Sequence, residues 1–285
     1  MPDLLAAGVR FNVVRLGAPP ARLVLIHGLL LDNLASYYLS IAPALAEHAS
    51  LLLYDLRGHG RSERPPTGYT MDDMVADVVA ILDAEGLTAP ITLIGNSFGA
   101  QIALRAAGDH PQRVGALVLI DPQTAIPDFV AELGDIVAAD PAERDRRAYE
   151  YKGRWLAENA GTRDQSSTGA APPTARATSI DSMLQQRRQR RSASVSVAEG
   201  LARDTSFVQD LKRQAAITDA QIERVHCPVL VVYGERSEMR RDEARLARLL
   251  PRADLATIPG MGHTVLMQAP DLLRDMILAW LARER

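Results

Sequence analysis

Residues 91–99, with the sequence ITLIGNSFG, decide the fold of this chain. Residues 91–94 have the apolar pattern of a strand, and a helical pattern follows over residues 101–107. Between them lies a G-x-S-x-G turn with Ser97 at its centre, in the strand, turn and helix setting that gives this motif its meaning. Glycine is needed on both sides because such a turn is strained and brings two backbones close together. The stretch predicts an exposed serine nucleophile, and an ordinary serine in a glycine-rich turn is the alternative.

The rest of the chain repeats the alternation of apolar strands with amphipathic helices. A strand that is buried on both faces of a parallel sheet reads as a nearly continuous apolar run. Runs of this kind, with one expected edge strand at 11–15, cover residues 22–26, 50–54, 114–120, 229–233 and 254–258. Helical patterns lie between or after them at residues 70–82, 243–250 and 272–281. The alternation predicts an α/β fold with a doubly wound, mostly parallel sheet.

The pattern changes near residue 125. Helical segments follow one another there without strands, and residues 161–178 form a Ser/Thr/Gly/Ala/Pro-rich stretch without apolar periodicity. The arginine cluster at 187–191 is expected to be a solvated face. We therefore predict a core domain from 1–124, a helical cap from 125–223 that includes a helical stretch over 198–215, and a second part of the core from 224–285.

Composition limits the possible partners and compartments. The chain has 285 residues, 47% of them hydrophobic and 24% charged, with a net charge of −3. It contains no apolar run long enough to cross a bilayer, so neither a membrane nor a nucleic acid is favoured as a partner. The first residues lack the pattern of a signal peptide, and the single Cys227 cannot form an internal disulfide. These features predict a cytoplasmic location.

Four motifs stand at the ends of predicted strands. They are His27-Gly28, the DLRGHGRS loop at 55–62, the turn around Ser97, and Gly262-His263. In this order and spacing, the chain resembles the α/β-hydrolase superfamily over nearly all its length. The resemblance implies a serine enzyme that needs no cofactor or metal, with a cap inserted after the strand at 114–120.

A serine hydroxyl is a weak nucleophile and needs a base within hydrogen-bonding reach. The resemblance implies that His263 is this base. His27 is the main competitor, but at the junction of strand and loop it is expected to hold the loop by hydrogen bonds. The resemblance also places His27 and Gly28 next to the substrate, together with Phe129 and Trp155 of the cap.

Acyl transfer also needs donors for the oxyanion of the tetrahedral intermediate. The resemblance implies the backbone amides of Leu29 and Phe98. Phe98 follows the nucleophile at the start of a helix, where amides without partners and the helix dipole favour negative charge. Leu29 follows Gly28, which lets the backbone approach closely, although a plain apolar pocket residue is also possible there.

The carboxylate of the expected triad departs from the family's common pattern. In that pattern an aspartate follows the strand at 229–233 as G-x-x-D, but here Ser237 stands at that place. The resemblance offers two replacements. Asp121 ends the strand after Ser97, a position used by haloalkane dehalogenases and certain polyketide-releasing thioesterases, and Glu238 is the neighbour of Ser237. We prefer Asp121, because a carboxylate at that strand end points into the crevice where open α/β sheets bind ligands. A turn-capping role for Asp121 remains the alternative.

These residues predict acyl transfer through an acyl-enzyme. Apolar cap residues suggest an ester or thioester of a largely apolar acyl group, carried by a small molecule, by coenzyme A or by a carrier protein. A serine in place of an aspartate nucleophile argues against dehalogenase chemistry. Two other classes remain open: a Ser-dependent lyase or C–C bond hydrolase, and a ligand-binding protein without catalysis.

Overall fold

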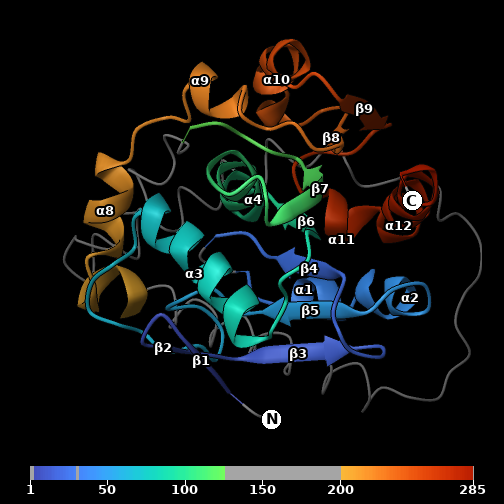
Figure 1. Cartoon of the computed structure of the whole chain (residues 1–285). Helices are drawn as coiled ribbons and strands as arrows, with labels where there is room; N and C mark the ends of the chain where they lie inside the picture. Colours follow the sequence, from blue (N-terminus) through green and yellow to red (C-terminus); the bar gives the residue numbers. More distant parts are fainter. Residues whose placement is uncertain (1–2, 30–31, 126–199, 285) are drawn as a thin grey trace, which may run out of the picture.

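A mostly parallel sheet forms the centre of the molecule. The computed structural model describes residues 3–29, 32–125 and 200–284. The strands of the sheet are β3 (Val13–Leu16), β4 (Leu23–Ile26), β5 (Leu51–Tyr54), β6 (Ile91–Asn96), β7 (Val114–Ile120), β8 (Val229–Gly234) and β9 (Ala253–Ile258). Their order is β3-β5-β4-β6-β7-β8-β9 (Figure 1). Strand β3 is antiparallel to β5, whereas β5, β4, β6, β7, β8 and β9 are parallel to one another. The predicted parallel α/β sheet is confirmed. A hairpin of β1 (Leu4–Ala6) and β2 (Val9–Phe11) lies apart from it.

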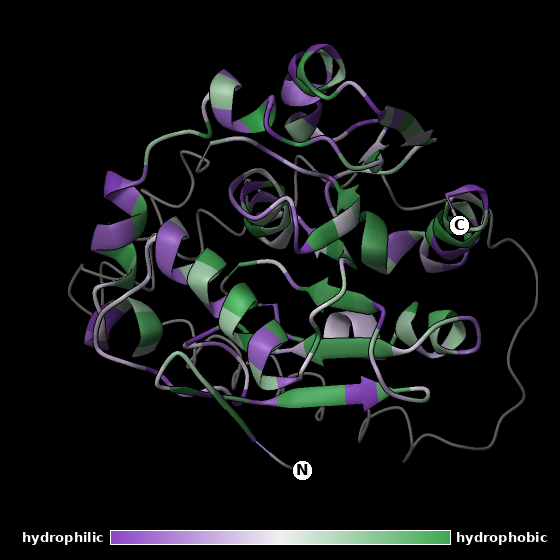
Figure 2. Ribbon diagram, viewed as in Figure 1, coloured by the Kyte–Doolittle hydropathy of each residue, from purple (hydrophilic) through white to green (hydrophobic). Residues whose placement is uncertain are grey.

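The sheet is buried on both faces. In β4, Val24 and Ile26 belong to one apolar cluster, whereas Leu23 and Leu25 belong to the other. Successive side chains of a strand point to opposite faces, so a continuous apolar run is what two buried faces require. Figure 2 shows hydrophobic residues along these strands and hydrophilic residues on the helices around them.

Helices cover each face of the sheet. One apolar cluster joins the sheet to helices on one side, among them α3 (Met71–Ala84), α4 (Phe98–Asp109), α8 (Phe207–Arg213), α9 (Asp219–Ile222) and α10 (Glu243–Leu249). The other cluster joins it to α1 (Ala35–Tyr38), α2 (Ala42–Ala46), α11 (Val265–Gln268) and α12 (Pro270–Arg283) (Figure 1). A short 3-10 helix, η2 (Glu238–Asp242), follows β8.

A capping box begins α3, whereas the helical stretch before α8 is interrupted. Thr70 caps α3: its side chain accepts from the Asp73 amide, and the Asp73 carboxylate accepts from the Thr70 amide. The described part of the helical block expected over 198–215 is helical at residues 200–204 and 207–213, with an interruption at residues 205–206 before α8 begins. There the Ser206 amide donates to the Pro66 carbonyl at 2.8 Å, so the backbone bonds outside the helix.

Most of the predicted cap lies outside the described residues. Residues 126–199, which include Phe129 and Trp155, belong to that part, and the cap boundaries at 125 and 223 stay a prediction. The described residues from 200 onward pack on the core, where Leu201, Phe207 and Leu211 are buried in the same cluster as α3. None of the helices in the described ranges is long and apolar enough to cross a membrane.

Buried charges hold the loop at residues 55–62. The Asp55 carboxylate accepts hydrogen bonds from the Asn12 side chain at 2.7 Å and from the Leu34 amide at 2.8 Å. Arg57 forms a buried ion pair with Asp77 on α3. Asp55 thereby ties the end of β5 to the segment that follows β4, at the carboxyl edge of the sheet.

Candidate active site

Ser97 stands at the junction of β6 and α4. Its backbone has φ 53° and ψ −112°, a conformation that few non-glycine residues adopt. A side-chain carbon on Gly95 would collide with the backbone of Gly99 and Ala100, and one on Gly99 would collide with the Ile26 carbonyl. The predicted need for glycine on both sides of the turn is therefore confirmed. Strain of this kind is held by the surrounding structure and is common at functional sites.

His263 meets Ser97 from the far end of the chain. The imidazole lies in the segment after β9, and its Nε2 is 3.1 Å from Ser97 Oγ. Its side chain is 30% exposed, so the ring can be reached from outside the core. The separation is that of a nucleophile and its base.

Asp121 reaches the other nitrogen of the same ring. It follows β7, is fully buried, and places Oδ2 at 2.5 Å from His263 Nδ1. Glu238, the alternative acid, is exposed in η2. The structure thus brings Asp121 to His263 and leaves Glu238 at the surface. Because the Nδ1–H of His263 donates to the Asp121 carboxylate, Nε2 is left as an acceptor for the Ser97 hydroxyl.

Ser237 is a member of the site that the sequence did not reveal as such. Its hydroxyl lies 2.5 Å from Asp121 Oδ2, and the Gly234 amide donates to Oδ1 at 3.1 Å. Considered alone, Ser237 in place of the usual aspartate indicates only that the acid is missing there. The sequence pattern that could have revealed its role is the combination of Ser237 with Asp121, which follows the preceding strand.

The expected oxyanion donors are the amides of Leu29 and Phe98, and Leu29 follows β4, which borders β6 on the side opposite to β7 and Asp121. Phe98 is the first residue of α4, and Leu29 follows the end of β4. Within residues 3–29, 32–125 and 200–284, neither amide donates a hydrogen bond to another residue. Both are therefore available to an oxyanion, as donors at a helix start and in a loop after a strand.

His27 holds the loop that carries Leu29. The side chain is fully buried; its Nε2 accepts from the Leu56 amide at 2.9 Å, so its Nδ1 is the donor to the Gly28 carbonyl at 2.7 Å. The Gly28 amide donates to Asp32 at 2.7 Å. In a trans peptide the Gly28 carbonyl and the Leu29 amide point in opposite directions, so the bond from His27 sets the direction of that amide. The buried His27 side chain thus supports the loop through both ring nitrogens, and contact of His27 and Gly28 with a substrate stays a prediction.

A series of buried rings continues from His27. The His27 and His59 rings have centroids 5.4 Å apart, and Phe207 lies 5.9 Å from His59 and 5.6 Å from Tyr69. Burial lowers the pKa of His59 to about 3. His59 is therefore neutral throughout the pH range in which proteins normally work.

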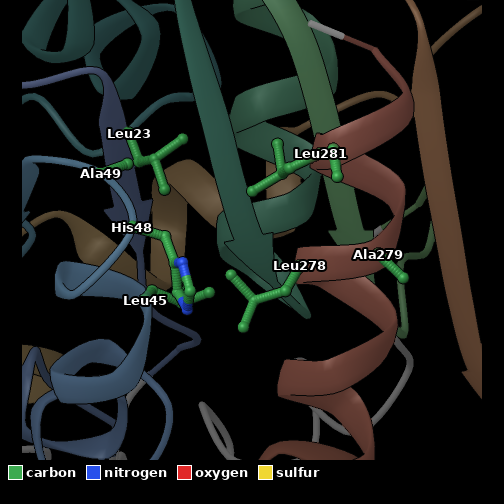
Figure 3. Close-up of a pocket in the computed structure, with 8 residues that line it drawn as sticks. Leu23, Leu45, His48, Ala49, Leu278, Ala279 and Leu281 are labelled. Atoms are coloured by element: carbon green, nitrogen blue, oxygen red, sulfur yellow. The ribbon is translucent and has the colours of Figure 1, made fainter.

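A separate cavity of about 330 Å³ opens between α2 and α12 (Figure 3). Its lining includes Leu23, Leu45, His48 and Leu278. Leu23 begins β4, whereas His27 follows the end of that strand, so this cavity and the Ser97 site lie at opposite edges of the sheet. The cavity is not part of the candidate active site.

Comparison with known proteins agrees with the fold described above. A family model described as alpha/beta hydrolase fold matches residues 21–270. Lipase LipV of Mycobacterium tuberculosis is 35% identical over 157 residues, which cover 52% of this chain and 56% of the lipase. Polyketide synthase ThaQ of Burkholderia thailandensis is 30% identical over 282 residues, which cover 97% of this chain and 12% of the synthase. The chain thus spans about half or less of these curated relatives.

The same arrangement of elements occurs in solved structures. A thermophilic esterase from Thermogutta terrifontis superposes with a TM-score of 0.72 at 21% sequence identity, covering 99% of this chain and 98% of the esterase. At that identity the likeness shows a shared fold.

Proposed function

This chain belongs to the α/β-hydrolase fold family, and on that premise we propose that it is a serine hydrolase acting on an ester or thioester of a largely apolar acyl group. One observation carries the proposal. The atoms Ser97 Oγ, His263 Nε2, His263 Nδ1 and Asp121 Oδ2 form one hydrogen-bonded series, with separations of 3.1 Å and 2.5 Å. Such a series activates a hydroxyl for attack on a carbonyl carbon.

The proposed reaction has two halves. As Ser97 Oγ bonds to the carbonyl carbon, its proton passes to His263 Nε2, and the charged imidazole is stabilised by Asp121. His263 then gives that proton to the departing alkoxide or thiolate, which leaves an acyl-enzyme. Water attacks the acyl-enzyme with His263 as base, and the acid product leaves. In both tetrahedral intermediates the oxyanion faces the amides of Leu29 and Phe98, each contributing about 3 kcal/mol.

The same catalytic residues can act on an ester and on a thioester carbonyl. The two substrate classes differ in the leaving group, which is an alkoxide or a thiolate. The similarities to a lipase and, over 97% of this chain, to a polyketide synthase support testing both classes. The acyl chain can be borne by a small molecule, coenzyme A or a carrier protein. The preference for an apolar acyl group rests on predicted cap residues, Phe129 and Trp155 among them, that lie outside the described residues.

Labelling with a fluorophosphonate probe tests the nucleophile. We expect the native protein to be labelled and Ser97→Ala to remain unlabelled, with thermal unfolding as the check that the variant is folded. Turnover of p-nitrophenyl butyrate and octanoate, compared with the N-acetylcysteamine thioesters of the same acids, then ranks the substrate classes. Absence of labelling would favour a ligand-binding protein. Labelling without turnover of any of the four substrates would favour a lyase or a C–C bond hydrolase.

A further inference from the structure

The turn from Gly234 to Ser237 at the end of β8 holds two donors for Asp121. The Ser237 amide closes the turn on the Gly234 carbonyl at 3.0 Å, which fixes the two residues relative to each other. From this turn the Gly234 amide donates to Asp121 Oδ1 at 3.1 Å, and Ser237 Oγ lies 2.5 Å from Oδ2. Asp121 is fully buried, so each donor replaces a hydrogen bond that water would otherwise supply.

The direction of the Ser237 hydroxyl follows from its neighbours. The Met239 amide donates to Ser237 Oγ at 3.2 Å, which occupies an acceptor position on that oxygen. An ionised carboxylate has no proton to give, so the Ser237 hydroxyl donates to Asp121. Asp121 Oδ2 therefore accepts two hydrogen bonds, one from the Ser237 hydroxyl and one from His263 Nδ1.

The same turn also contacts the segment that carries His263. A side-chain carbon on Gly234 would collide with the carbonyls of Met261 and Gly262, and the Arg236 amide donates to the Met261 carbonyl at 2.8 Å. The turn thus touches the carboxylate and the histidine segment together. Asp121 itself has φ 48°, in the left-handed region, so its conformation depends on such surrounding contacts.

We propose that Ser237 is a positioning residue for the triad, and this inference rests on the proposed function. Its hydroxyl holds Asp121 Oδ2 in line with His263 Nδ1 and shares the negative charge of the carboxylate. In the family's common pattern position 237 carries the acid of the triad. In this chain the residue at that position would donate a hydrogen bond to the acid, which comes from Asp121 instead. A methyl group at this position would leave Oδ2 with one donor fewer in a buried site.

Substitution of Ser237 tests the role with p-nitrophenyl butyrate as substrate. We expect Ser237→Ala to lower kcat about tenfold with KM unchanged, because a donor to a charged group is lost. A carboxylate with one donor fewer holds the imidazolium proton more strongly, so the acid limb of the kcat/KM profile should move to higher pH. Ser237→Thr, which keeps the hydroxyl, should restore both kcat and the profile.

Parallel variants separate failure of this inference from failure of the proposed function. If Asp121→Asn keeps full activity, the proposed acid is wrong and the role of Ser237 falls with it. If Asp121→Asn is inactive but Ser237→Ala keeps the native kcat and pH profile, only the role of Ser237 is overturned. Where Ser237→Ala does not fold, Ser237→Cys replaces it, and a native kcat and profile in that weak donor would overturn the inference.

Discussion

The two sides of Ser97 are built from different chemistry. On one side, which we call the amide side, His27 and Asp32 hold a loop: His27 donates to the Gly28 carbonyl, the Asp32 carboxylate accepts from the Gly28 amide, and the Leu29 amide is left without a partner among the described residues. On the other, the acid side, the buried carboxylate of Asp121 receives three hydrogen bonds. The amide side therefore depends on the direction of one peptide plane, and the acid side depends on the place of one charge.

This difference explains why the acid can be supplied from different positions in the chain, whereas the oxyanion amide cannot. A charge can be delivered from any neighbouring strand end that reaches His263, and parallel β7 and β8 both end beside it. An amide has to come from the backbone of one particular loop, which His27 and Asp32 hold at Gly28. The carboxylate can therefore be moved to another strand end, whereas the amide cannot be moved to another loop.

The largest expected effect is on the acid side. Asp121→Asn should lower kcat by about 10⁴-fold, because an amide favours the wrong tautomer of His263 and cannot stabilise its charged form. Glu238→Gln is the matched control and should retain native kcat, since Glu238 is exposed in η2. Steady-state turnover of p-nitrophenyl butyrate measures both. The reverse order of effects would transfer the acid role to Glu238.

The next effect is on the amide side, where two substitutions of His27 separate its two hydrogen bonds. His27→Asn can keep a donor near the position of Nδ1, whereas His27→Gln can keep an acceptor near that of Nε2. Release of the Gly28 carbonyl should turn the Leu29 amide away, so we expect His27→Gln to lower kcat by up to about 10²-fold.

Comparison of the two His27 variants supplies the control. His27→Asn should retain more of the native kcat than His27→Gln does, although it loses the bond from the Leu56 amide. Thermal unfolding of both shows whether either result comes from a loss of folded protein. Equal losses of kcat at equal stability would contradict the role of the Nδ1 donor.

Much of the fold was readable from the sequence, because burial on two faces leaves a continuous apolar run and a capped helix leaves polar residues at its start. Ser97 and His263 could be predicted from the sequence as well, since both belong to motifs at strand ends. The sequence offers two candidate acids, Asp121 and Glu238, and does not decide between their positions. The choice depends on where η2 directs one side chain, and the sequence contains no periodic signal for that direction.

The role of Ser237 was not predicted at all. A single hydroxyl gains its meaning from the carboxylate 2.5 Å away, and that carboxylate is distant in the chain. The direction of the Leu29 amide was hidden for a similar reason, because it depends on the peptide plane that His27 holds. Phe129, Trp155 and the cap boundaries stay predictions, because residues 126–199 lie outside the described part.

A smaller effect would show whether the two strand ends on the acid side are interchangeable. A carboxylate at position 237 is longer than the serine hydroxyl, which already lies 2.5 Å from Asp121 Oδ2. The double variant Asp121→Asn/Ser237→Asp should therefore recover about tenfold in kcat over Asp121→Asn alone, because a charge again reaches His263. Ser237→Asp alone is the control and should be impaired, since two carboxylates would then share one buried site. No recovery in a folded double variant would limit the acid to the end of β7.

The smallest effect concerns stability on the amide side. His59 is buried with a pKa of about 3, whereas an unfolded histidine titrates near 6.5, so between these values the unfolded chain binds the proton and the folded chain does not. Stability therefore falls as pH falls through this window, with a limiting slope of about 1.4 kcal/mol per pH unit from this residue.

His59→Asn, which can keep a donor toward the Arg57 carbonyl, should remove that part of the slope in urea unfolding at pH 4 to 7. The exposed His226 offers the matched control, because His226→Asn should leave the slope unchanged. An unchanged slope in His59→Asn would show that the acid sensitivity of the fold originates elsewhere, and that the neutral state of the buried His59 ring does not limit the stability of the amide side.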